Sequence, residues 1–233
     1  MTASGPRGKA AWPAGVTAIM HVDIWADMVC PWCYLGKRRF ERALESFEGG
    51  DEVTVTYHSF ELDPTMPPGG TTPTVERLAS KYQMSREQAE QAQRQMEQRA
   101  TGDGLTFRMD GLVSGNTRDA HRLLQLAKVR GHQAELMERL HRAYFSEQGS
   151  IFDHASLTSL AAEAGLDPGE VAQVLATDEY GDEVDADEEM ARSLGATGVP
   201  FFVVGRRYAF SGAQSPETIA EVLERASADA TAS

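Results

Sequence analysis

The sequence predicts an α/β fold in which a large all-helical insertion interrupts a smaller unit of strands and helices. Three observations predict it. Residues 21–62 have the pattern strand, helix, strand, which normally folds as two parallel strands joined by a crossover helix. Residues 74–194 have an almost wholly helical pattern. From residue 198 onward the pattern returns to strands and ends in one closing helix.

The first unit is predicted from the spacing of its apolar residues. These alternate along 21–26, as in a strand with one buried face. A helix is expected over 31–47, because Pro31 suits a first helical turn and apolar side chains then recur at helical spacing. Residues 52–62 are rich in β-branched and aromatic side chains and predict a second strand, which a Pro- and Gly-rich loop at 64–73 follows.

The insertion is predicted as a series of amphipathic helices. Ser85 and Gln88 have the spacing of a capping box, in which each side chain bonds the other residue's backbone N–H, and Asp153 is placed to cap a later helix. Residues 105–115 show no period and are expected to be irregular. The expected helices are 74–82, 85–101, 116–129, 132–145, 153–164, 168–176 and 179–194.

The closing segment is predicted as a hairpin and a helix. An apolar strand is expected over 198–205, a tight turn at Arg206 and Arg207, and a return strand over 208–211. Pro216 then opens a helix that is expected to end at Ala226.

The two ends of the chain are expected to lie outside the folded part. The apolar run within residues 1–19 is too short for a signal peptide, and Pro13 and Gly15 interrupt it. We therefore expect these residues to be a disordered extension. Met20 offers an alternative start just before the first strand. The expected division is 1–19 extension, 20–71 first part of the α/β domain, 72–180 helical insertion domain, 181–228 second part and 229–233 tail.

Composition excludes some classes of function. The 233 residues carry a net charge of −13 and are 41% hydrophobic, enough for a substantial core. The acidic balance argues against nucleic acid and against anionic membrane surfaces, because both require a basic face. No apolar run is long enough to span a bilayer. Without a leader, we expect a cytoplasmic protein.

Cys30 and Cys33 are the only cysteines, and they lie where the first strand passes into the first helix. Chance placement would give this spacing in roughly one case in a hundred. The unpaired N–H groups and the positive dipole end at a helix N-terminus favour the thiolate form of Cys30, and the thiolate is the nucleophile. Cys33 follows one turn later and can attack a mixed disulfide on Cys30. We expect Cys30 to be the exposed nucleophile and Cys33 the resolving thiol.

Other interpretations of these side chains are weaker. A structural zinc site needs four ligands, and the six histidines offer no second pair at ligand spacing, so no metal site is expected. A structural disulfide across so short a loop would constrain the unfolded chain little. The acidic run 178–189 is expected to be a solvated helix face rather than a cation site, because acids near a helix N-terminus are favourable without a metal.

Four strings carry a family resemblance: CPWCYLG at 30–36, SFELDP at 59–64, NTRDAHRL at 116–123 and GATGVPFF at 195–202. Together with the order of elements, they resemble the cytosolic FrnE-like branch of the DsbA family over residues 20–226. The resemblance implies a thioredoxin-like fold with a large helical insertion, in which 20–71 and 181–228 form the thioredoxin-like domain. It also implies a cis peptide bond between Val199 and Pro200, beside the cysteines.

The catalytic candidates are therefore Cys30 and Cys33. Several of the surrounding residues also have simpler explanations: Phe60 can be a core residue, Asn116 a helix cap, His121 a packed histidine and Pro200 a proline that merely opens a strand. The candidate substrate-binding residues are Pro31, Trp32, Phe60, Asn116, His121, Val199 and Pro200.

The expected function is that of a thiol–disulfide oxidoreductase that exchanges disulfides with protein or peptide thiols, with no resident cofactor and with glutathione open as a redox co-substrate. Trp32 stands where strongly oxidising relatives have a histidine, so we expect a less oxidising couple. One alternative is a glutathione-dependent transferase or isomerase, as in the related kappa glutathione transferases and 2-hydroxychromene-2-carboxylate isomerases, which have a serine where Cys30 stands. The other is a peptide-binding holdase.

Overall fold

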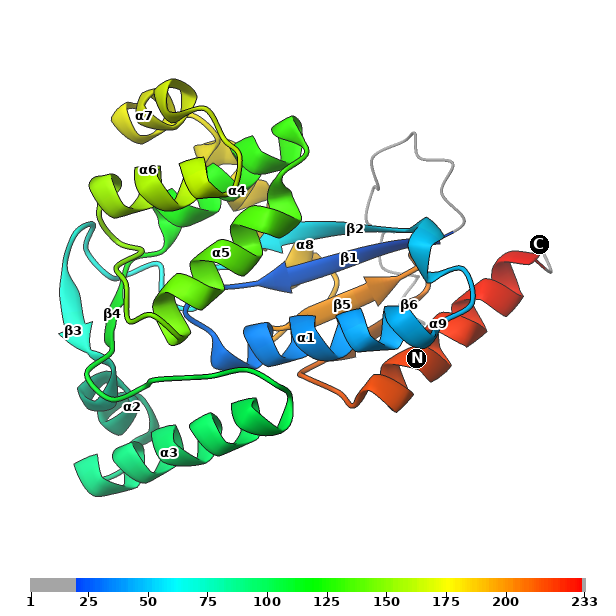
Figure 1. The fold of residues 1–233 in the computed structure, drawn as a ribbon, viewed down its shortest axis with the longest axis horizontal. Coiled ribbons are helices and arrows are strands. Elements are labelled where there is room, and N and C mark those ends of the chain that lie inside the picture. The colour runs from blue at the N-terminus through cyan, green and yellow to red at the C-terminus, as the bar shows by residue number, and fades with distance from the viewer. Residues whose placement is uncertain (1–19, 232–233) are drawn as a thin grey trace, which may run out of the picture.

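A four-stranded mixed sheet forms the centre of the computed structural model, which describes residues 20–231 (Figure 1). The predicted extension at 1–19 lies outside these residues. The predicted thioredoxin-like fold is confirmed: a parallel strand pair lies beside an antiparallel hairpin. The sheet order is β2-β1-β5-β6, with β1 (Met20–Ala26), β2 (Val53–Ser59), β5 (Phe201–Val204) and β6 (Tyr208–Ser211).

Helices cover both faces of this sheet because the strands are apolar on both sides. α1 (Pro31–Ser46) and α9 (Pro216–Thr231) pack against each other in front of the sheet in Figure 1, over the buried side chains of Val22 and Ile24. α8 (Gly181–Ser193) and α4 (Arg118–Arg130) pack against β2 and against one another.

The insertion gathers at the carboxyl end of β1, where α1 begins (Figure 1). Its helices follow the predicted series closely, and the Ser85–Gln88 capping box is present. Between β1 and β2, only the short helix η1 (Gly50–Glu52) was not predicted. The insertion contains α2 (Thr74–Tyr82), α3 (Arg86–Gly102), α5 (Gln133–Phe145), α6 (His154–Glu163) and α7 (Pro168–Ala176), besides α4. Among the described residues, no helix combines the length and apolarity needed to cross a bilayer.

β2 ends at Ser59, three residues before the predicted end of that strand. The backbone N–H groups that follow bond to side chains instead of to a strand. Glu61 N–H donates to Glu188 at 2.8 Å, and Leu62 N–H donates to Asp27 Oδ2 at 2.8 Å. The chain therefore turns away from the sheet, and Phe60 leaves the strand to pack beside Trp25.

Other element boundaries differ from the predicted ones because of long-range strand pairing or helix propensity. The predicted loop 64–73 and the irregular stretch 105–115 each contain a short strand, β3 (Thr71–Pro73) and β4 (Val113–Gly115), which pair with each other. α9 runs beyond the predicted end at Ala226 to Thr231, because alanine-rich sequence favours helix.

A buried polar network ties α8 to the sheet and corrects the expectation of a wholly solvated acidic face. Asp187 Oδ1 lies 2.6 Å from His58 Nδ1, and Asp23 Oδ1 lies 2.8 Å from His58 Nε2. Trp25 stacks on the His58 ring with centroids 4.4 Å apart and donates its indole N–H to the Asp187 carbonyl. The acidic run therefore supplies one buried carboxylate as well as solvated ones.

Candidate active site

Cys30 occupies the N-cap position of α1, directly after β1. Its backbone is extended, and Pro31 follows at the first helical position, where a missing N–H costs nothing. The Cys30 N–H donates to the Asp27 carbonyl at 3.1 Å, and the Cys30 carbonyl accepts from Cys33 N–H at 3.0 Å. The Cys30 thiol donates to the Val199 carbonyl at 3.6 Å. Strand end, helix start and the loop before β5 thus meet at one sulfur atom.

Both thiols are free and buried, so the expectation of an exposed Cys30 is wrong. Only 3% of Cys30 and 2% of Cys33 is accessible to solvent. The two differ in what they face, because Cys30 lines a cavity and Cys33 does not. Burial, followed by a hydrogen bond and charge interaction with Cys30, raises the pKa of Cys33 well above that of a free thiol.

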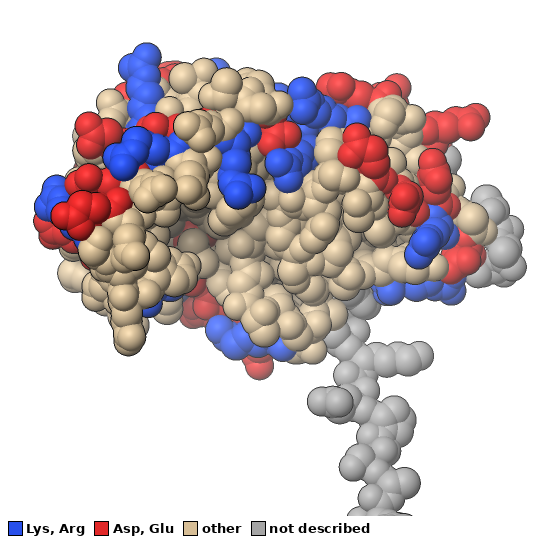
Figure 2. All heavy atoms as spheres, turned by 90° about the horizontal axis from the view of Figure 1, so that it is seen from below, with Lys and Arg blue, Asp and Glu red and all other residues tan. Residues whose placement is uncertain are grey.

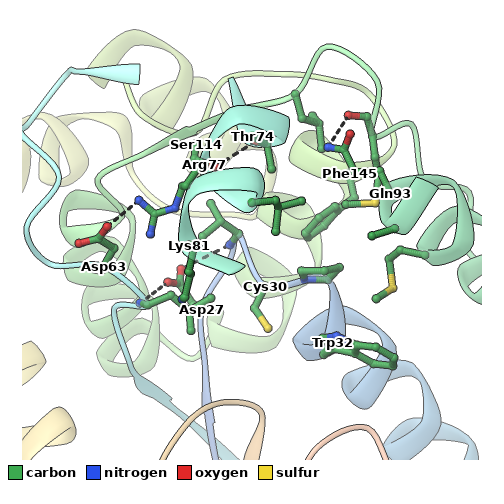
Figure 3. Close-up of a pocket in the computed structure, with 18 of the residues that line it drawn as sticks. Asp27, Cys30, Trp32, Asp63, Thr74, Arg77, Lys81, Gln93, Ser114 and Phe145 are labelled. Atoms are coloured by element: carbon green, nitrogen blue, oxygen red, sulfur yellow. Dashed lines mark hydrogen bonds and ion pairs between the residues drawn. The ribbon is translucent and has the colours of Figure 1, made fainter. Parts of the chain in front are cut away.

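The cavity has a volume of about 700 Å³ and separates the start of α1 from α2 and α3. Figure 3 shows Cys30 between Asp27 and Trp32 at its base, with Arg77 and Lys81 on the opposite wall. Four methionines contribute to the wall, and their flexible thioether chains suit an adaptable apolar site. The apolar lining includes Met66, Met84, Met96, Met109, Leu62, Leu78, Leu112 and Phe145.

The charged groups of the cavity are unevenly paired. Asp63 forms an ion pair with Arg77 at 2.5 Å. Hydrogen bonds from Thr65 and Arg77 lower the pKa of Asp63, although its partial burial opposes this shift. Lys81 and Arg99 form no ion pair with any described residue. The cavity of a strongly acidic chain therefore presents cations without carboxylate partners.

An aromatic contact bridges the mouth of the cavity. Trp32 is 39% exposed, and the Arg99 guanidinium lies 5.7 Å from the centre of its ring. This cation–π contact joins the cysteine helix α1 to α3 of the insertion. Tyr82, at the end of α2, is also exposed at the cavity. Figure 2 shows a hollowed face whose central part carries few charged side chains.

The loop before β5 completes the site. The Val199–Pro200 peptide bond is cis, and Val199 lines the cavity beside Cys30. Pro200 does not line it. The Pro200 ring packs against α1 instead, where a Cβ on Gly36 would lie 3.0 Å from the ring. The close approach of α1 to Pro200 therefore depends on a residue without a side chain.

Besides Pro200, three further predicted binding residues lie away from the cavity. Phe60 packs in the core cluster of Trp25 and Phe201. Asn116 precedes α4, where its side-chain oxygen accepts from Arg118 N–H at 2.9 Å and its amide donates to the Met66 carbonyl. His121 is wholly buried, with its Nε2 atom 3.6 Å from Asp27 Oδ1. Of the surrounding candidates, Pro31, Trp32 and Val199 face the cavity.

Sequence reasoning missed Asp27 and the cationic side chains of α2 and α3. The sequence does contain a signal for Asp27, because this acidic residue interrupts an apolar stretch three residues before Cys30. Lys81 and Arg99 have none, because both are ordinary polar-face residues until the fold turns them toward Cys30. Residues 20–231 contain no group of three His, Cys, Asp or Glu side chains placed to hold a metal.

A thioredoxin-type sheet with a cysteine at the start of its first helix is an arrangement typical of oxidoreductases and related isomerases. The sequence model of the DSBA-like thioredoxin domain matches residues 21–224, so the chain belongs to the family of DsbA-like disulfide oxidoreductases.

Individual proteins are also similar to this chain. A probable DsbA oxidoreductase from Streptomyces coelicolor is 46% identical, with a TM-score of 0.86 and 89% of each chain covered. The uncharacterized protein YwbO of Bacillus subtilis strain 168 is 28% identical, covering 80% of this chain and 87% of that protein. The cytosolic disulfide reductase DsbM from Pseudomonas aeruginosa, solved with GSH, is 18% identical with a TM-score of 0.56, covering 91% and 98%, and shares the fold.

Proposed function

We propose that this chain is a thiol–disulfide oxidoreductase that exchanges disulfides with protein or peptide thiols through Cys30 and Cys33. One observation carries the proposal: of the two free cysteines, only Cys30 faces the cavity, and Cys33 lies buried one helical turn behind it. This is the arrangement that a two-step exchange needs, with one sulfur meeting the substrate and the other resolving the intermediate.

In the reductive direction, the Cys30 thiolate attacks one sulfur of a substrate disulfide. A Cys30–substrate disulfide forms, and the other substrate sulfur leaves as a thiolate that takes a proton. The Cys33 thiolate then attacks Cys30 Sγ, forming the Cys30–Cys33 disulfide and releasing the second substrate thiol. Two electrons pass from the cysteine pair to the substrate, and the oxidative direction runs the same steps backward.

The residues around Cys30 have supporting roles in this proposal. Val199 places its backbone carbonyl 3.6 Å from the thiol, and the same peptide segment would lie alongside a bound substrate chain. Trp32 and Tyr82 offer exposed apolar surface at the cavity mouth. Pro31 starts the helix without an unpaired N–H beside the sulfur.

Trapping of the intermediate tests the proposal. Cys33→Ser keeps the attacking thiol and removes the resolving one, so it is expected to accumulate a covalent adduct on Cys30 when it meets a protein disulfide. Cys30→Ser is the matched control and should trap nothing. Mass spectrometry of the adducts measures both. A Cys33→Ser protein that forms no adduct would refute thiol exchange.

A second measurement is the reduction potential of the pair against glutathione. We expect a defined two-electron couple less oxidising than the strongly oxidising enzymes near about −120 mV, because an indole at position 32 cannot stabilise a thiolate as an imidazolium does. A value near −120 mV would contradict this expectation. We also propose a cytoplasmic location, where such a pair would be held mainly as the dithiol.

Glutathione is a second candidate partner, either as co-substrate or as the substrate of a transferase reaction. The observation that favours it is the cavity, whose 700 Å³ suits a small molecule and whose Lys81 and Arg99 suit carboxylates. Conjugate formation from glutathione that survives Cys30→Ser would favour the transferase; loss of all thiol reactions in that variant would favour disulfide exchange.

A further inference from the structure

Two exposed cations line the cavity without a carboxylate partner. Lys81 reaches it from the last turn of α2, and Arg99 reaches it from the second half of α3. Neither forms an ion pair within residues 20–231, although most other lysine and arginine side chains there do. We call this pair the cavity cations. Their position beside Cys30, in a chain with a net charge of −13, indicates a place for a negatively charged ligand.

The carboxylates nearby are already bound by other groups. Asp27 is wholly buried, and its two oxygens accept backbone N–H groups at 3.3 and 2.8 Å. Asp63 pairs with Arg77 at 2.5 Å. Glu76, on the adjoining surface, lies 3.7 Å from Arg86. The cavity cations are therefore available to carboxylates that a ligand brings.

Each cavity cation lies over an exposed aromatic ring. Arg99 Cζ is 5.7 Å from the centre of the Trp32 ring, and Lys81 Nζ is 5.9 Å from the centre of the Tyr82 ring. A ring attracts a cation through its π face and supplies no acceptor atom. The N–H donors of both cations thus remain available for charge-assisted hydrogen bonds to a carboxylate, which a guanidinium can bind in a bidentate manner.

The cavity adjoins a second hollow, so the space is long. The cavity has a volume of about 700 Å³ and the second hollow one of about 710 Å³. Sites for single small molecules are usually about 300–1,000 Å³, so the two hollows together suit a longer ligand. The residues that line both are Leu62, Asp63, Met66, Arg77 and Lys81.

The spacing of the cavity cations also indicates an extended ligand. Lys81 lies shortly before the start of α3 at Arg86, whereas Arg99 lies near the far end of that helix. At about 1.5 Å per residue, α3 covers about 20 Å between Arg86 and Arg99. An extended peptide of about six residues covers that length, and a tripeptide covers about half of it. Figure 3 shows Lys81 on one side of Cys30 and Trp32 on the other.

Much of the remaining wall is apolar. Four methionines contribute to it, and their flexible thioether chains can adapt to different apolar side chains. The cavity therefore offers apolar surface near Cys30 and a positive charge on each side of it. The four are Met66, Met84, Met96 and Met109.

We propose that Lys81 and Arg99 are specificity-determining residues that select extended, acidic segments of substrate proteins, with apolar residues next to the reactive cysteine. This inference rests on the proposed disulfide exchange and names its substrate class. The segment's outer carboxylates pair with the cavity cations, its apolar side chains contact the methionine wall, and Cys30 attacks the sulfur held between them. The chemical steps are those of the exchange given above.

The test uses synthetic peptides of equal length with one central cysteine, joined through a disulfide to an uncharged thiopyridine. Apolar residues flank the cysteine, and the outer positions are glutamate, glutamine or lysine. The Cys30 thiolate attacks the peptide sulfur and forms a Cys30–peptide disulfide, while the thiopyridine leaves as a thiolate that takes a proton and absorbs light. Full-length Cys33→Ser is the parent protein, because its reaction stops at this step. Stopped-flow absorbance gives the second-order rate constants.

The parent is expected to react about three- to tenfold faster with the glutamate peptide than with the glutamine peptide, in keeping with a few exposed charge pairs. The lysine peptide should react slowest. High salt should reduce the preference, because it screens exposed charges. Adding Lys81→Gln or Arg99→Gln should lower the ratio of the glutamate rate to the glutamine rate, and both together should bring it near one. This ratio cancels any change in the reactivity of Cys30 itself.

Arg94→Gln is the matched control, since Arg94 is an exposed cation on the same helix that does not line the cavity. It changes the net charge equally and should leave the ratio at the parent value. Arg99→Lys keeps the charge and should retain a preference for glutamate. Thermal unfolding verifies that each variant is folded. Equal rates for the three peptides in the parent would overturn the proposal, and so would an equal loss of preference in Arg94→Gln.

Glutathione joined to the same thiopyridine separates a short anionic thiol from an acidic segment. We expect it to react more slowly than the glutamate peptide, because it is too short to reach both cavity cations. A faster reaction that Lys81→Gln and Arg99→Gln abolish would assign the cations to glutathione and overturn the acidic-segment proposal. Absence of thiopyridine release from every peptide would instead refute the disulfide exchange, and so would release that Cys30→Ser performs equally well.

Discussion

Gly36 lies one turn after Cys33, at the point where α1 comes closest to the loop that carries Pro200. A Cβ at this position would lie 3.0 Å from Pro200 Cγ and 3.4 Å from the Phe202 ring. These neighbours are a rigid ring and a wholly buried core aromatic, so neither can move aside freely. The absence of one side chain therefore sets the distance between the cysteine helix and Val199.

Gly36→Ala should accordingly destabilise the protein by about 1–3 kcal/mol, the usual cost of overpacking. It should also slow the reaction of Cys30 with a disulfide, because α1 would move away from the Val199 carbonyl. Urea unfolding and the rate of alkylation of Cys30 measure the two effects.

Gly102→Ala is the control for this substitution. Gly102 ends α3 in open space, with no atom within 4 Å of an added Cβ. Its replacement should leave stability unchanged or slightly increased, because alanine favours helix more than glycine does. Equal stability of the Gly36 and Gly102 variants would show that the close approach at Pro200 is not tight.

At the scale of elements, α2 and α3 form the wall of the cavity that lies opposite Cys30. No residue of α2 is buried, and α3 buries only Ala89, Gln93, Met96 and Ala100. Such helices gain little from packing, so their local stability depends on their caps. Ser85 provides one: its hydroxyl accepts from Gln88 N–H at 3.2 Å, and the Gln88 side chain accepts from Ser85 N–H at 2.8 Å.

Ser85→Ala is therefore expected to cost about 1 kcal/mol, the typical value of an N-cap. The loss should be local, appearing as faster hydrogen exchange in 86–102 with little change in the exchange of β1 and β5. Ser159→Ala, an exposed position inside α6, is the control and should have no such effect. Uniform destabilisation of sheet and insertion would contradict a local role.

At the scale of the whole molecule, the buried His58 network connects the sheet to α8. Burial lowers the pKa of His58, but hydrogen bonds to Asp187 and Asp23 outweigh burial and raise it. Burial raises the pKa of both aspartates, but hydrogen bonds from the histidines outweigh burial. The pKa of Asp23 therefore falls to about 2, and the pKa of Asp187 is also lowered. The folded state thus favours an imidazolium between two carboxylates.

The stability of the protein should therefore peak between about pH 4 and pH 6.5, the unfolded values of aspartate and histidine. The His58 contribution is complete below its unfolded pKa and is lost as pH rises through its higher folded pKa. The aspartate contributions are complete above their unfolded pKa and are lost as pH falls through the folded values. Chemical unfolding at several pH values measures the profile.

Asp187→Asn tests whether this network is the source of the profile. Removal of one partner of a buried ion pair costs about 3–5 kcal/mol, and the alkaline decline should become shallower because the His58 pKa falls. Asp182→Asn, an exposed neighbour on the same helix, is the control. An unaltered alkaline slope in Asp187→Asn would show that other groups produce it.

The sequence was sufficient wherever the deciding interaction is local. The structure contains the predicted features that depend on residues a few positions apart. These are the strand and helix that carry Cys30, the capping box at Ser85, the cap at Asp153 and the closing hairpin. The β3–β4 pair was missed because its partners lie about forty residues apart and neither strand has a pattern of its own.

The order of elements and the cysteine pair at the start of a helix could be read from the sequence alone, because backbone propensity, capping and thiol spacing are properties of neighbouring residues. The burial of Cys30, the cavity that it faces, the positions of Lys81 and Arg99 on the wall of that cavity, and the approach of His121 to Asp27 depend on the tertiary structure. These groups come from segments far apart in the chain, and their burial and charge arise only when packing excludes water between them.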